Sequence, residues 1–369
     1  MVVGGGPAGA STACGLAMGG REVVLIERSL GSHHKVCGEF ISPETQAHLA
    51  HLGVGLGSLG AVRIDKVCVL TARRAIAVAL PFAGLSLSRL RLDEAILERA
   101  EYVGAELWRG VRVLSASHEE TGWILRCSGG KEIRCRNLVV ATGKSALRGI
   151  SDQRNSSMVG LKIHLKPSSA ARSELAGQVQ LFLLDQGYAG LELVEGGIVN
   201  LCLVLPANTL ARIGRGWGPL RNFLASANPQ LAQRLEALSA LWEKPLAVVC
   251  PRHGHIHRAW PPPRSRFYPV GDRLGHIPPF TGDGLAMALS SAALAVKTLR
   301  RDESAATYRC QATQLIAPAL RTAGFISRIA ATGTGQAILV RAAAQFPDLV
   351  RLVARRTRMP RPDLGQEGA

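Results

Sequence analysis

Residues 1–9 constrain the fold of this chain more than any other stretch of the sequence. They read as a short apolar strand followed by a tight turn, with glycines in the places of a G-x-G-x-x-G pattern, Gly4, Gly6 and Gly9. A helix rich in alanine and glycine and a second apolar strand, residues 23–26, follow the turn. This order of strand, glycine turn, helix and strand predicts the first unit of a dinucleotide-binding α/β domain with a parallel sheet.

The chemistry of nucleotide binding explains each residue type in this unit. The glycines allow the chain to turn, to approach a pyrophosphate and to pack the helix closely on the sheet. Pro7 and Ala8 begin that helix, whose free N–H groups attract phosphates. Glu27 stands 18 residues after Gly9, where a carboxylate accepts hydrogen bonds from ribose hydroxyls and disfavours a 2′-phosphate. FAD or NAD is therefore a better ligand than NADP.

The first strand begins at residue 1 of the sequence. That makes it short for a central strand, which typically has about five residues. We expect either that residues preceding Met1 are missing or that the strand is truncated.

The length, composition and charge of the chain limit its possible size, partners and class of protein. With 369 residues, 47% of them hydrophobic, the chain can bury a core and form two lobes. The net charge of +17 raises nucleic acid as a partner, but the basic residues are scattered and aromatic residues make up only 5%, which is poor for base stacking. We expect no nucleic-acid binding and attribute the charge to solubility and to anionic cofactors or acyl-carrier partners.

Cysteine spacing and hydropathy indicate a cytoplasmic protein. None of the eight cysteines forms a C-x-x-C pair and several lie in apolar runs, which suits reduced buried thiols rather than disulfides or a zinc site. No run of about 18 apolar residues predicts a membrane span, and no signal peptide is expected. Peripheral membrane contact stays open, because residues 349–356 are basic and amphipathic.

The middle of the chain predicts mostly strands. Residues 61–80 alternate like strands, with a break at 81–84, and Ser88 is a credible N-cap for a helix that carries Arg89. Short hairpin strands follow, and from residue 156 long alternating strands predict a separate, mainly antiparallel sheet. The expected strands cover residues 108–115, 122–127, 133–135, 138–143, 158–165, 179–184, 188–194 and 198–205, with a turn at 195–197, and a helix over 229–242 follows the N-cap Asn228.

The loop over residues 28–44 holds chemically capable side chains. Lys35, Cys37 and Glu39 lie close together in it, and it leads into a helix near Pro43. A long loop in this position often returns to a ligand, although a surface loop with one incidental cysteine also fits the composition.

Three alternating histidines, His253, His255 and His257, fall on one face of an extended segment. No carboxylate or cysteine accompanies them, so we expect them to be exposed or packed rather than bound to metal. We expect no metal site in this chain.

Residues 266–299 return to the pattern of the first unit. A strand ends at Gly271 and Asp272, a glycine-containing loop over 278–284 follows, and a helix is expected over 285–299. This arrangement supplies a carboxylate for sugar-like hydroxyls and a helix N-terminus for partial negative charge. In a flavin site these groups would meet the ribityl chain and the N1–C2=O edge of the ring.

These features together resemble the FAD-dependent monooxygenases of the p-hydroxybenzoate hydroxylase fold, which geranylgeranyl reductases and flavin halogenases share. The resemblance rests on the glycine turn with Glu27, on Arg89 before a helix, on residues 141–143, and on Gly271 and Asp272 with residues 278–284, and it spans residues 1 to about 300. It implies that Glu27 binds the adenosine ribose, that Arg89 lies near the pyrophosphate and that Asp272 binds the ribitol.

The resemblance also implies a full set of cofactor contacts. The backbone of residues 282–284 would face the isoalloxazine and Val113 would meet the adenine. The residues expected to contact FAD are Gly4, Gly6, Pro7, Ala8, Gly9, Glu27, Arg28, Lys35, Cys37, Gly38, Arg89, Val113, Thr142, Gly143, Gly271, Asp272, Pro279, Gly282 and Gly284.

The sequence departs from the motifs of these families in three places. The hydroxylases usually carry Asp-Gly where this chain has Thr142-Gly143-Lys144, so the source of reducing equivalents is open. The W-x-W-x-I-P signature of halogenases is absent, which argues against halogenation. Residues 35–39, and residues 187–190 with 199–200, look closer to the geranylgeranyl reductase branch, although its tyrosine-x-tryptophan pattern is not matched at 188–190.

We therefore expect an α/β protein with a Rossmann-like FAD-binding domain over 1–155 and 251–300, a substrate domain over 156–250 built on a mainly antiparallel sheet, and C-terminal helices over 301–369. The favoured activity is an FAD monooxygenase that hydroxylates or epoxidises an apolar or aromatic small molecule through a flavin C4a-(hydro)peroxide, with NADH or NADPH as donor. The alternatives are a reductase of C=C bonds in a lipid-like substrate and a non-catalytic nucleotide-binding module. Cys37, Glu39 and Tyr188 are the candidate catalytic residues, and the substrate is either free or linked to a carrier or lipid.

Overall fold

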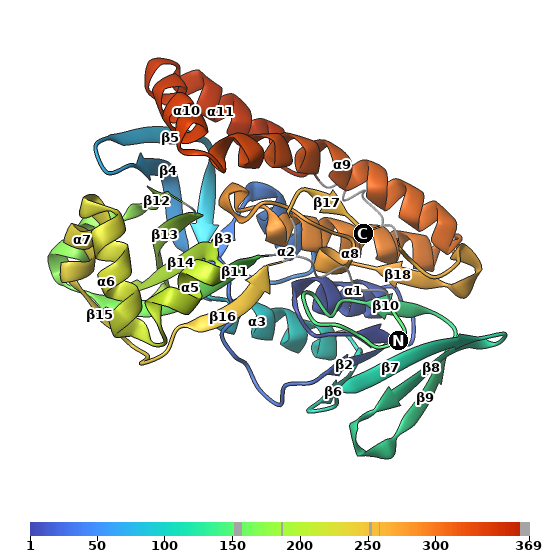
Figure 1. Cartoon of the computed structure of the whole chain (residues 1–369). Helices are drawn as coiled ribbons and strands as arrows, with labels where there is room; N and C mark the ends of the chain where they lie inside the picture. The colour runs from blue at the N-terminus through green and yellow to red at the C-terminus, as the bar shows by residue number, and fades with distance from the viewer. Residues whose placement is uncertain (151–156, 186, 251–252, 258, 362–369) are drawn as a thin grey trace.

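A computed structural model describes residues 1–150, 157–185, 187–250, 253–257 and 259–361. Two large sheets organise the molecule, and a group of helices from the C-terminal part of the chain lies along one side of both (Figure 1). The predicted fold class is confirmed: a Rossmann-like α/β unit with a parallel sheet, a second and mainly antiparallel sheet, and C-terminal helices.

The parallel sheet has five strands, and every neighbouring pair in it is parallel. Their spatial order is β18 (Phe267–Pro269), β10 (Leu138–Val140), β1 (Val2–Val3), β2 (Val24–Glu27) and β6 (Glu106–Arg109). Alternate side chains fill two cores: Val2 and Leu25 face the helices, whereas Val3 and Ile26 face a small antiparallel sheet. Burial on both faces is why these strands are continuously apolar in the sequence.

Helices α1 (Pro7–Met18), α3 (Arg89–Tyr102) and α8 (Gly284–Arg300) cover the first of these faces, and α2 (Pro43–His51) packs against α8. The small sheet on the other face consists of β7 (Val113–Glu119), β8 (Gly122–Cys127) and β9 (Glu132–Cys135). The expected single strand over 108–115 is wrong, because β6 joins the parallel sheet and Gly110, with φ +74°, turns the chain before β7.

The large sheet has nine strands. Its order is β15 (Leu238–Ala240), β11 (Met158–Pro167), β14 (Ile198–Pro206), β13 (Gly187–Val194), β12 (Gly177–Leu184), β4 (Val62–Leu70), β5 (Ala75–Ser86) and β3 (Phe40–Ile41), and β16 (Leu246–Cys250) also pairs with β11. All pairs are antiparallel except β12 with β4. Because β3, β4 and β5 come from residues 40–86, this sheet extends beyond the proposed substrate domain, and the division into domains stays a proposal.

Several predicted boundaries differ from the structure. The strand expected over 138–143 ends at Val140, and the strand expected to reach Asp272 ends at Pro269. Strand β5 continues through residues 81–84, since its register against β4 shifts there and Pro81 falls where the ladder is already irregular. The helix expected over 229–242 is α7 (Pro229–Glu236), which ends early because residues 238–240 pair with β11. Its predicted N-cap is confirmed: the side chain of Asn228 accepts hydrogen bonds from the N–H groups of Gln230 (3.0 Å) and Leu231 (3.2 Å).

The two faces of the large sheet differ in chemistry. One face packs against α4 (Ser169–Leu175), α5 (Ala207–Ile213), α6 (Trp217–Ala227) and α7 in a core of leucines and other apolar side chains. The opposite face carries polar side chains, including Lys162, His164, Glu192 and Asn200, although these are buried.

The C-terminal helices complete the fold. Helix α9 (Ala305–Ala330) packs against α8, and α10 (Gly333–Gln345) and α11 (Pro347–Arg356) lie against β5 (Figure 1). Short strands β17 (His255–Ile256) and β19 (Gly275–His276) form a separate pair. Within the described residues, no helix has both the length and the apolar character needed to cross a bilayer.

Candidate active site

The glycine turn after β1 is shaped by close backbone contacts. Gly4 has φ +106°, and a Cβ added to it would lie 2.5 Å from the carbonyl oxygen of Ala141. A Cβ added to Gly9 would lie 1.8 Å from the carbonyl oxygen of Gly4. Both positions therefore require glycine for the strand and helix to pack as they do.

Glu27 is held at the end of β2 by this turn. The N–H of Gly5 donates to Oε2 of Glu27 (2.6 Å) and the N–H of Ser29 donates to Oε1 (2.9 Å). Burial would raise the pKa of Glu27, but these two hydrogen bonds and the charge of Lys35 lower it. The N–H of Val111 donates to the carbonyl of Glu27 (3.1 Å), which brings the start of β7 and Val113 to the same end of the sheet.

Gly6, the N-cap of α1, opens onto a positively charged space. No side chain caps this helix, so its first N–H groups remain available to a ligand. A Cβ added to Gly6 would meet only Nζ of Lys35 (3.8 Å) and Nη2 of Arg89 (3.9 Å). Free helix N–H groups and two cations around one open space form an anion cradle.

Asp93 orients both cations. Arg89 donates to its two carboxylate oxygens (2.6 and 2.8 Å), and Nζ of Lys35 lies 3.0 Å from Oδ2. Burial would raise the pKa of Asp93, but the charges of Arg89 and Lys35 lower it. The carboxylate neutralises only part of the cationic charge, so an anion can still be attracted to the cradle.

The loop that carries Cys37 joins this cradle to the large sheet. The N–H of Arg89 donates to Oε1 of Glu39, two residues after Cys37 (2.7 Å), and Nδ2 of Asn200 on β14 donates to the Cys37 carbonyl (3.1 Å). Gly38 is exposed, with open space where a side chain would be. Glu39 adopts φ +59°, a conformation that is uncommon for a residue other than glycine.

Glu39 holds the Cys37 loop in place through its buried carboxylate. Its fully buried carboxylate accepts a hydrogen bond from Lys162, lies 2.9 Å from Nε2 of His164, and accepts from the N–H of Arg89 (2.7 Å). Burial would raise the pKa of Glu39, but the hydrogen bond to His164 and the charge of Lys162 lower it. All of its acceptor sites face protein groups, which suits a positioning residue better than one that touches substrate.

His34 lies beside this cluster, and its ring packs on those of His164 (4.7 Å between centroids) and Trp242 (4.7 Å). The possible ligand atoms of His34, Glu39 and His164 lie within 4.8 Å of one another. The ammonium group of Lys162 occupies the same carboxylate, however, and would repel a metal cation. The cluster is therefore better described as a charge network.

The polar face of the large sheet contains Tyr188 and Glu192, both on β13. The pairing places Gly190 opposite Cys202, and Glu192 opposite Asn200. Burial raises the pKa of Tyr188, and the thiols of Cys37, Cys202 and Cys250 contribute to the same effect. Tyr188, Glu192 and Asn200 lie on one face of the large sheet, and Asn200 holds the Cys37 loop against that face. We call the region over this face, which holds the phenol and the Cys37 loop, the shared space.

Glu192 is a site residue that the sequence analysis missed. It is buried, and Nδ2 of Asn200 donates to its Oε1 (3.3 Å). Burial and the nearby charge of Glu39 raise the pKa of Glu192 to about 8, although the Asn200 hydrogen bond acts in the opposite direction. A glutamate between Leu191 and Leu193 in an apolar strand was the signal that could have identified it.

We expect Glu192→Gln to remove a pH-dependent loss of stability. Between pH 4.5, the ordinary pKa of a glutamate, and about pH 8, Glu192 stays protonated in the folded protein but loses its proton in the unfolded chain. The free energy of unfolding therefore falls as the pH rises through this range. Glutamine cannot ionise, and the variant should be more stable than the wild type by a few kcal/mol near pH 8 and similar near pH 4.5. Urea unfolding across this range measures the difference, and parallel pH profiles would contradict the assignment.

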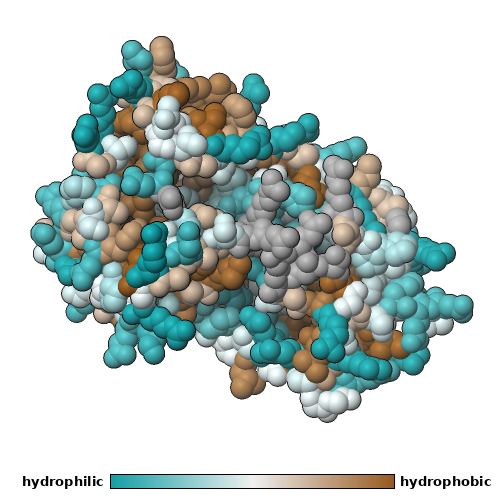
Figure 2. Space-filling model, in the orientation of Figure 1, coloured by the Kyte–Doolittle hydropathy of each residue, from teal (hydrophilic) through white to brown (hydrophobic). Residues whose placement is uncertain are grey.

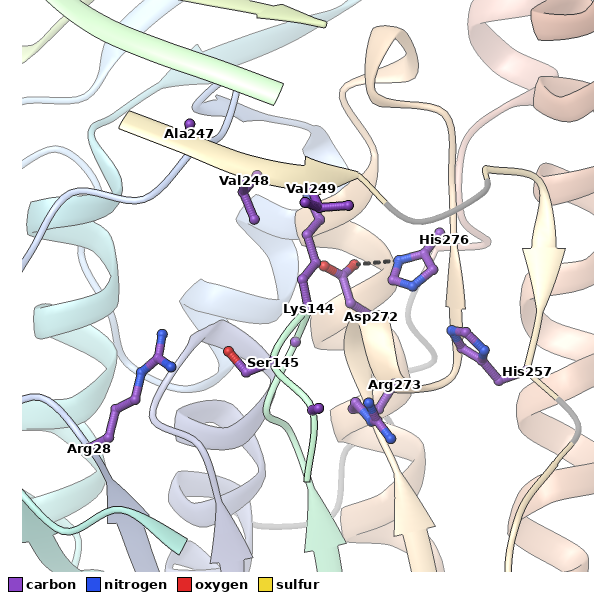
Figure 3. A pocket seen from close by; sticks show the side chains of 12 residues that line it. Arg28, Lys144, Ser145, Ala247, Val248, Val249, His257, Asp272, Arg273 and His276 are labelled. Carbon is purple, nitrogen blue, oxygen red and sulfur yellow. Dashed lines mark ion pairs between the residues drawn. The ribbon is translucent and has the colours of Figure 1, made fainter. Parts of the chain in front are cut away.

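A cavity of about 440 Å³ opens between β16 and the ends of β10 and β18 (Figure 3). It is lined by Arg28, Gly143, Lys144, Ser145, Ala146, Ala247, Val248, Val249, His257, Asp272, Arg273 and His276. The carboxylate of Asp272 lies between Lys144 and His276, 3.7 Å from Nδ1 of the histidine (Figure 3). Thr142, next to Gly143, donates its hydroxyl to the carbonyl of Ser145 (2.9 Å).

The charges in this cavity stabilise one another. Burial would raise the pKa of Asp272, but His276 and the charges of Lys144 and Arg89 lower it. Burial would lower the pKa of Lys144, but Asp272 raises it. Arg28, Gly143 and Asp272, which were expected to contact FAD, all line this cavity, whereas Lys144 was not among the expected residues. The available signal was a lysine directly after Thr142-Gly143, where the hydroxylases carry Asp-Gly.

Helix α8 begins close to the start of α1, because a Cβ added to Gly271 would lie 3.0 Å from Cβ of Ala8 and 3.6 Å from Cβ of Ala288. Its N-cap Asp283 provides no side-chain cap, Gly284 opens onto free space, and Gly282 has φ +67°. Asp283 instead binds the C-terminal part of the chain: it accepts from the N–H of Met359 (2.7 Å), and Nη1 of Arg358 lies 3.2 Å away. Burial raises the pKa of Asp283 to about 6, although Arg358 opposes the rise.

Residues 1–153 match the family described as FAD binding domain. This part of the chain is an FAD-binding domain. The protein is thus an FAD-dependent oxidoreductase, and the expected cofactor, FAD, is confirmed at this level.

The FAD-dependent oxidoreductase is similar to two menaquinone reductases. It is 31% identical to that of Mycobacterium tuberculosis over 150 residues, which are 39% of this chain and 37% of the relative. The aligned part thus spans well under half of that relative. It is 24% identical to the menaquinone reductase of Mycolicibacterium smegmatis over 328 residues, 81% of this chain and 75% of the relative.

Solved structures share the fold of this oxidoreductase. A flavoprotein/dehydrogenase from Cytophaga hutchinsonii superposes with a TM-score of 0.78 at 16% identity and covers 96% of this chain and 91% of its own. A flavin-dependent brominase has a TM-score of 0.75 at 16% identity, over 96% of this chain and 92% of its own. The halogenase PltM in complex with phloroglucinol and FAD has a TM-score of 0.68 at 15% identity, over 89% and 75%.

Proposed function

We propose that this oxidoreductase reduces a carbon–carbon double bond of a lipid-like substrate of the menaquinone kind. The observation that carries the proposal is the Cys37 loop, which is tied to the anion cradle by the hydrogen bond from the N–H of Arg89 to Glu39 and to the large sheet through Asn200. The loop therefore holds a thiol in the space that Tyr188 also faces. The similarity to menaquinone reductase extends over both sheets, which supports a substrate of the same class.

In this proposal the cleft holds FAD in the orientation expected from the sequence. The uncapped start of α1, Lys35 and Arg89 would bind the pyrophosphate, and Glu27 would bind the adenosine ribose near Val113. Asp272 would bind the ribitol, and residues 282–284 would lie under the isoalloxazine, with Pro279 exposed beside them. The open space at Gly6, the two uncapped helix starts and the flanking cations fit a dinucleotide diphosphate.

The residues of the chain have distinct tasks in the reaction. Bound FAD supplies a hydride equivalent, which NADH, NADPH or a partner reductase replaces. Saturation of a double bond also needs one proton, and the Cys37 thiol and the Tyr188 hydroxyl are the candidate donors at the shared space. Glu39 positions the loop, and Lys162 and His164 hold Glu39.

A monooxygenase that hydroxylates or epoxidises an apolar or aromatic small molecule is the second candidate. The resemblance of the glycine turn with Glu27, of Arg89 and of Asp272 to the monooxygenases of the p-hydroxybenzoate hydroxylase fold favours it. The two reactions differ in their need for oxygen, because a reduction consumes only reducing equivalents and a proton.

We expect product to form without O2 when the FAD-loaded enzyme is supplied with reductant and menaquinone in detergent. Cys37→Ala should lower kcat by about a hundredfold, the usual size of a lost proton-transfer contribution. Cys310→Ser, at the exposed free thiol of α9, is the matched control and should leave kcat unchanged. Strict dependence on O2 would reject the reductase and support the monooxygenase.

Asp272→Ala is expected to lower the FAD content of the purified protein. The carboxylate lies in the cavity between Lys144 and His276, where a ribityl chain would find a hydrogen-bond acceptor. Asp65→Ala, which removes an exposed ion pair with Arg63, is the control. The ratio of flavin absorbance to protein absorbance measures occupancy, and an unchanged ratio in Asp272→Ala would refute the assignment.

A further inference from the structure

The C-terminal helices present a surface that the proposed reaction does not use. Of the eleven large hydrophobic residues that are exposed among the described residues, five lie between the end of α9 and the end of α11. They are Phe325 (58% exposed), Ile338 (59%), Phe346 (62%), Leu349 (41%) and Leu352 (48%). This concentration is unusual, since single exposed apolar residues are normally scattered.

Three of these residues form a ridge along α11. Phe346, Leu349 and Leu352 follow one another at intervals of three, so they lie on one side of the helix. The intervening Val350 and Val353 are less exposed and turn toward the protein. One side of the helix therefore packs against the protein, and the other side carries the exposed apolar ridge.

Arginines surround the ridge. Residues 321–361 contain eight arginines and a single acid, Asp348. Asp348 pairs with Arg351 (2.9 Å), whereas within the described part of the chain Arg341, Arg355 and Arg356 have no ion-pair partner. Figure 2 shows brown atoms at the end of the molecule where α10 and α11 lie in Figure 1, with teal atoms around them.

We propose that this C-terminal face, formed by Phe325, Ile338, α11 and the flanking arginines, binds the surface of an anionic lipid bilayer. Apolar side chains on such a face enter the boundary of headgroups and acyl chains, and each basic residue near the surface is attracted by anionic headgroups. The charge pattern selects this partner over a second copy of the chain, because two such faces would repel each other.

The location of the face relates it to the substrate. Nε2 of Gln336, near the start of α10, donates to the carbonyl of Leu184 at the end of β12 (3.0 Å), and Leu184 pairs with Gly187, next to Tyr188. The face thus borders the strand that leads to the shared space. That this contact delivers a lipid-borne substrate rests on the proposed function, whereas the binding itself does not.

Flotation of the FAD-loaded enzyme with vesicles tests the proposal. We expect binding to vesicles of phosphatidylcholine and phosphatidylglycerol and much weaker binding to phosphatidylcholine alone. Charge reversal in Arg355→Glu/Arg356→Glu, and removal of the ridge in Leu349→Ser/Leu352→Ser, should each weaken binding at least about tenfold. The control Leu114→Ser/Arg126→Glu changes the same residue types, also exposed, on β7 and β8, and should bind as the wild type does.

Several results would overturn the proposal. They are wild-type protein that stays unbound with both vesicles, equal binding to neutral and anionic vesicles, and ridge or arginine variants that bind like the wild type. A dimer in sedimentation equilibrium that the ridge variant abolishes would assign the face to self-association instead. Turnover of menaquinone in detergent should be unchanged in all these variants, so failure of the reductase proposal would be seen separately.

Discussion

Glu39→Gln is expected to lower the free energy of unfolding by about 3–5 kcal/mol, the loss typical of a buried ion pair that keeps only one partner. The ammonium group of Lys162 and the carboxylate of Glu39 are both fully buried. Glutamine keeps the size of the side chain but leaves the Lys162 ammonium without a counter-charge. Urea unfolding of the protein without FAD near neutral pH measures the loss.

The pH dependence gives this prediction a second test. Because the pKa of Glu39 in the folded protein lies below its ordinary value of 4.5, its contribution is present above that value and is lost as the pH falls through the lowered pKa. The difference between wild type and Glu39→Gln should therefore shrink in acid. Asp65→Ala, at an exposed ion pair, should cost less than about 1 kcal/mol. A loss from Glu39→Gln no larger than that of the control would show that the network is not stabilising.

Gly6→Ala should weaken FAD binding by about a hundredfold, or about 2.7 kcal/mol, without lowering the stability of the protein. A methyl group at Gly6 would lie in open space near Lys35 and Arg89, where the pyrophosphate is proposed to approach the backbone. The φ of Gly6 is −74°, which alanine adopts without strain.

Gly9→Ala is the matched comparison, because it inserts the same methyl group one helical turn away. Its Cβ would lie 1.8 Å from the carbonyl oxygen of Gly4, so the protein itself should be destabilised. Flavin fluorescence titration and thermal unfolding of the proteins without FAD separate the two effects. Equal FAD affinity in Gly6→Ala and wild type would place the pyrophosphate elsewhere.

The parts of the site that could be predicted are those coded within short stretches of sequence. The glycine turn, Glu27, the helix beginning after Ser88 and the strand before Asp272 each carry a local pattern, and each forms the expected kind of element. The N-cap of Ser88 is confirmed by its hydrogen bond from the N–H of Arg91 (3.3 Å). Such patterns work because caps and turns depend on neighbouring residues only.

The charge network could not be predicted in this way. Lys162 and His164 meet Glu39 across more than a hundred residues, and Glu192 meets Asn200 only because β13 and β14 pair in one register. A shift of one residue would turn these side chains into the leucine core on the other face. In the sequence, such a network is indicated only by polar residues at alternate positions in apolar strands.

The order in which the parallel sheet is assembled has a consequence for synthesis of the protein. Its edge strand β18 is translated after every strand of the large sheet, and it pairs with residues 138–140. Asp272 and the start of α8 come later still. The nucleotide cleft can therefore be completed only after every strand of the second sheet has been synthesised, so FAD can enter its complete site only late in the synthesis of the chain.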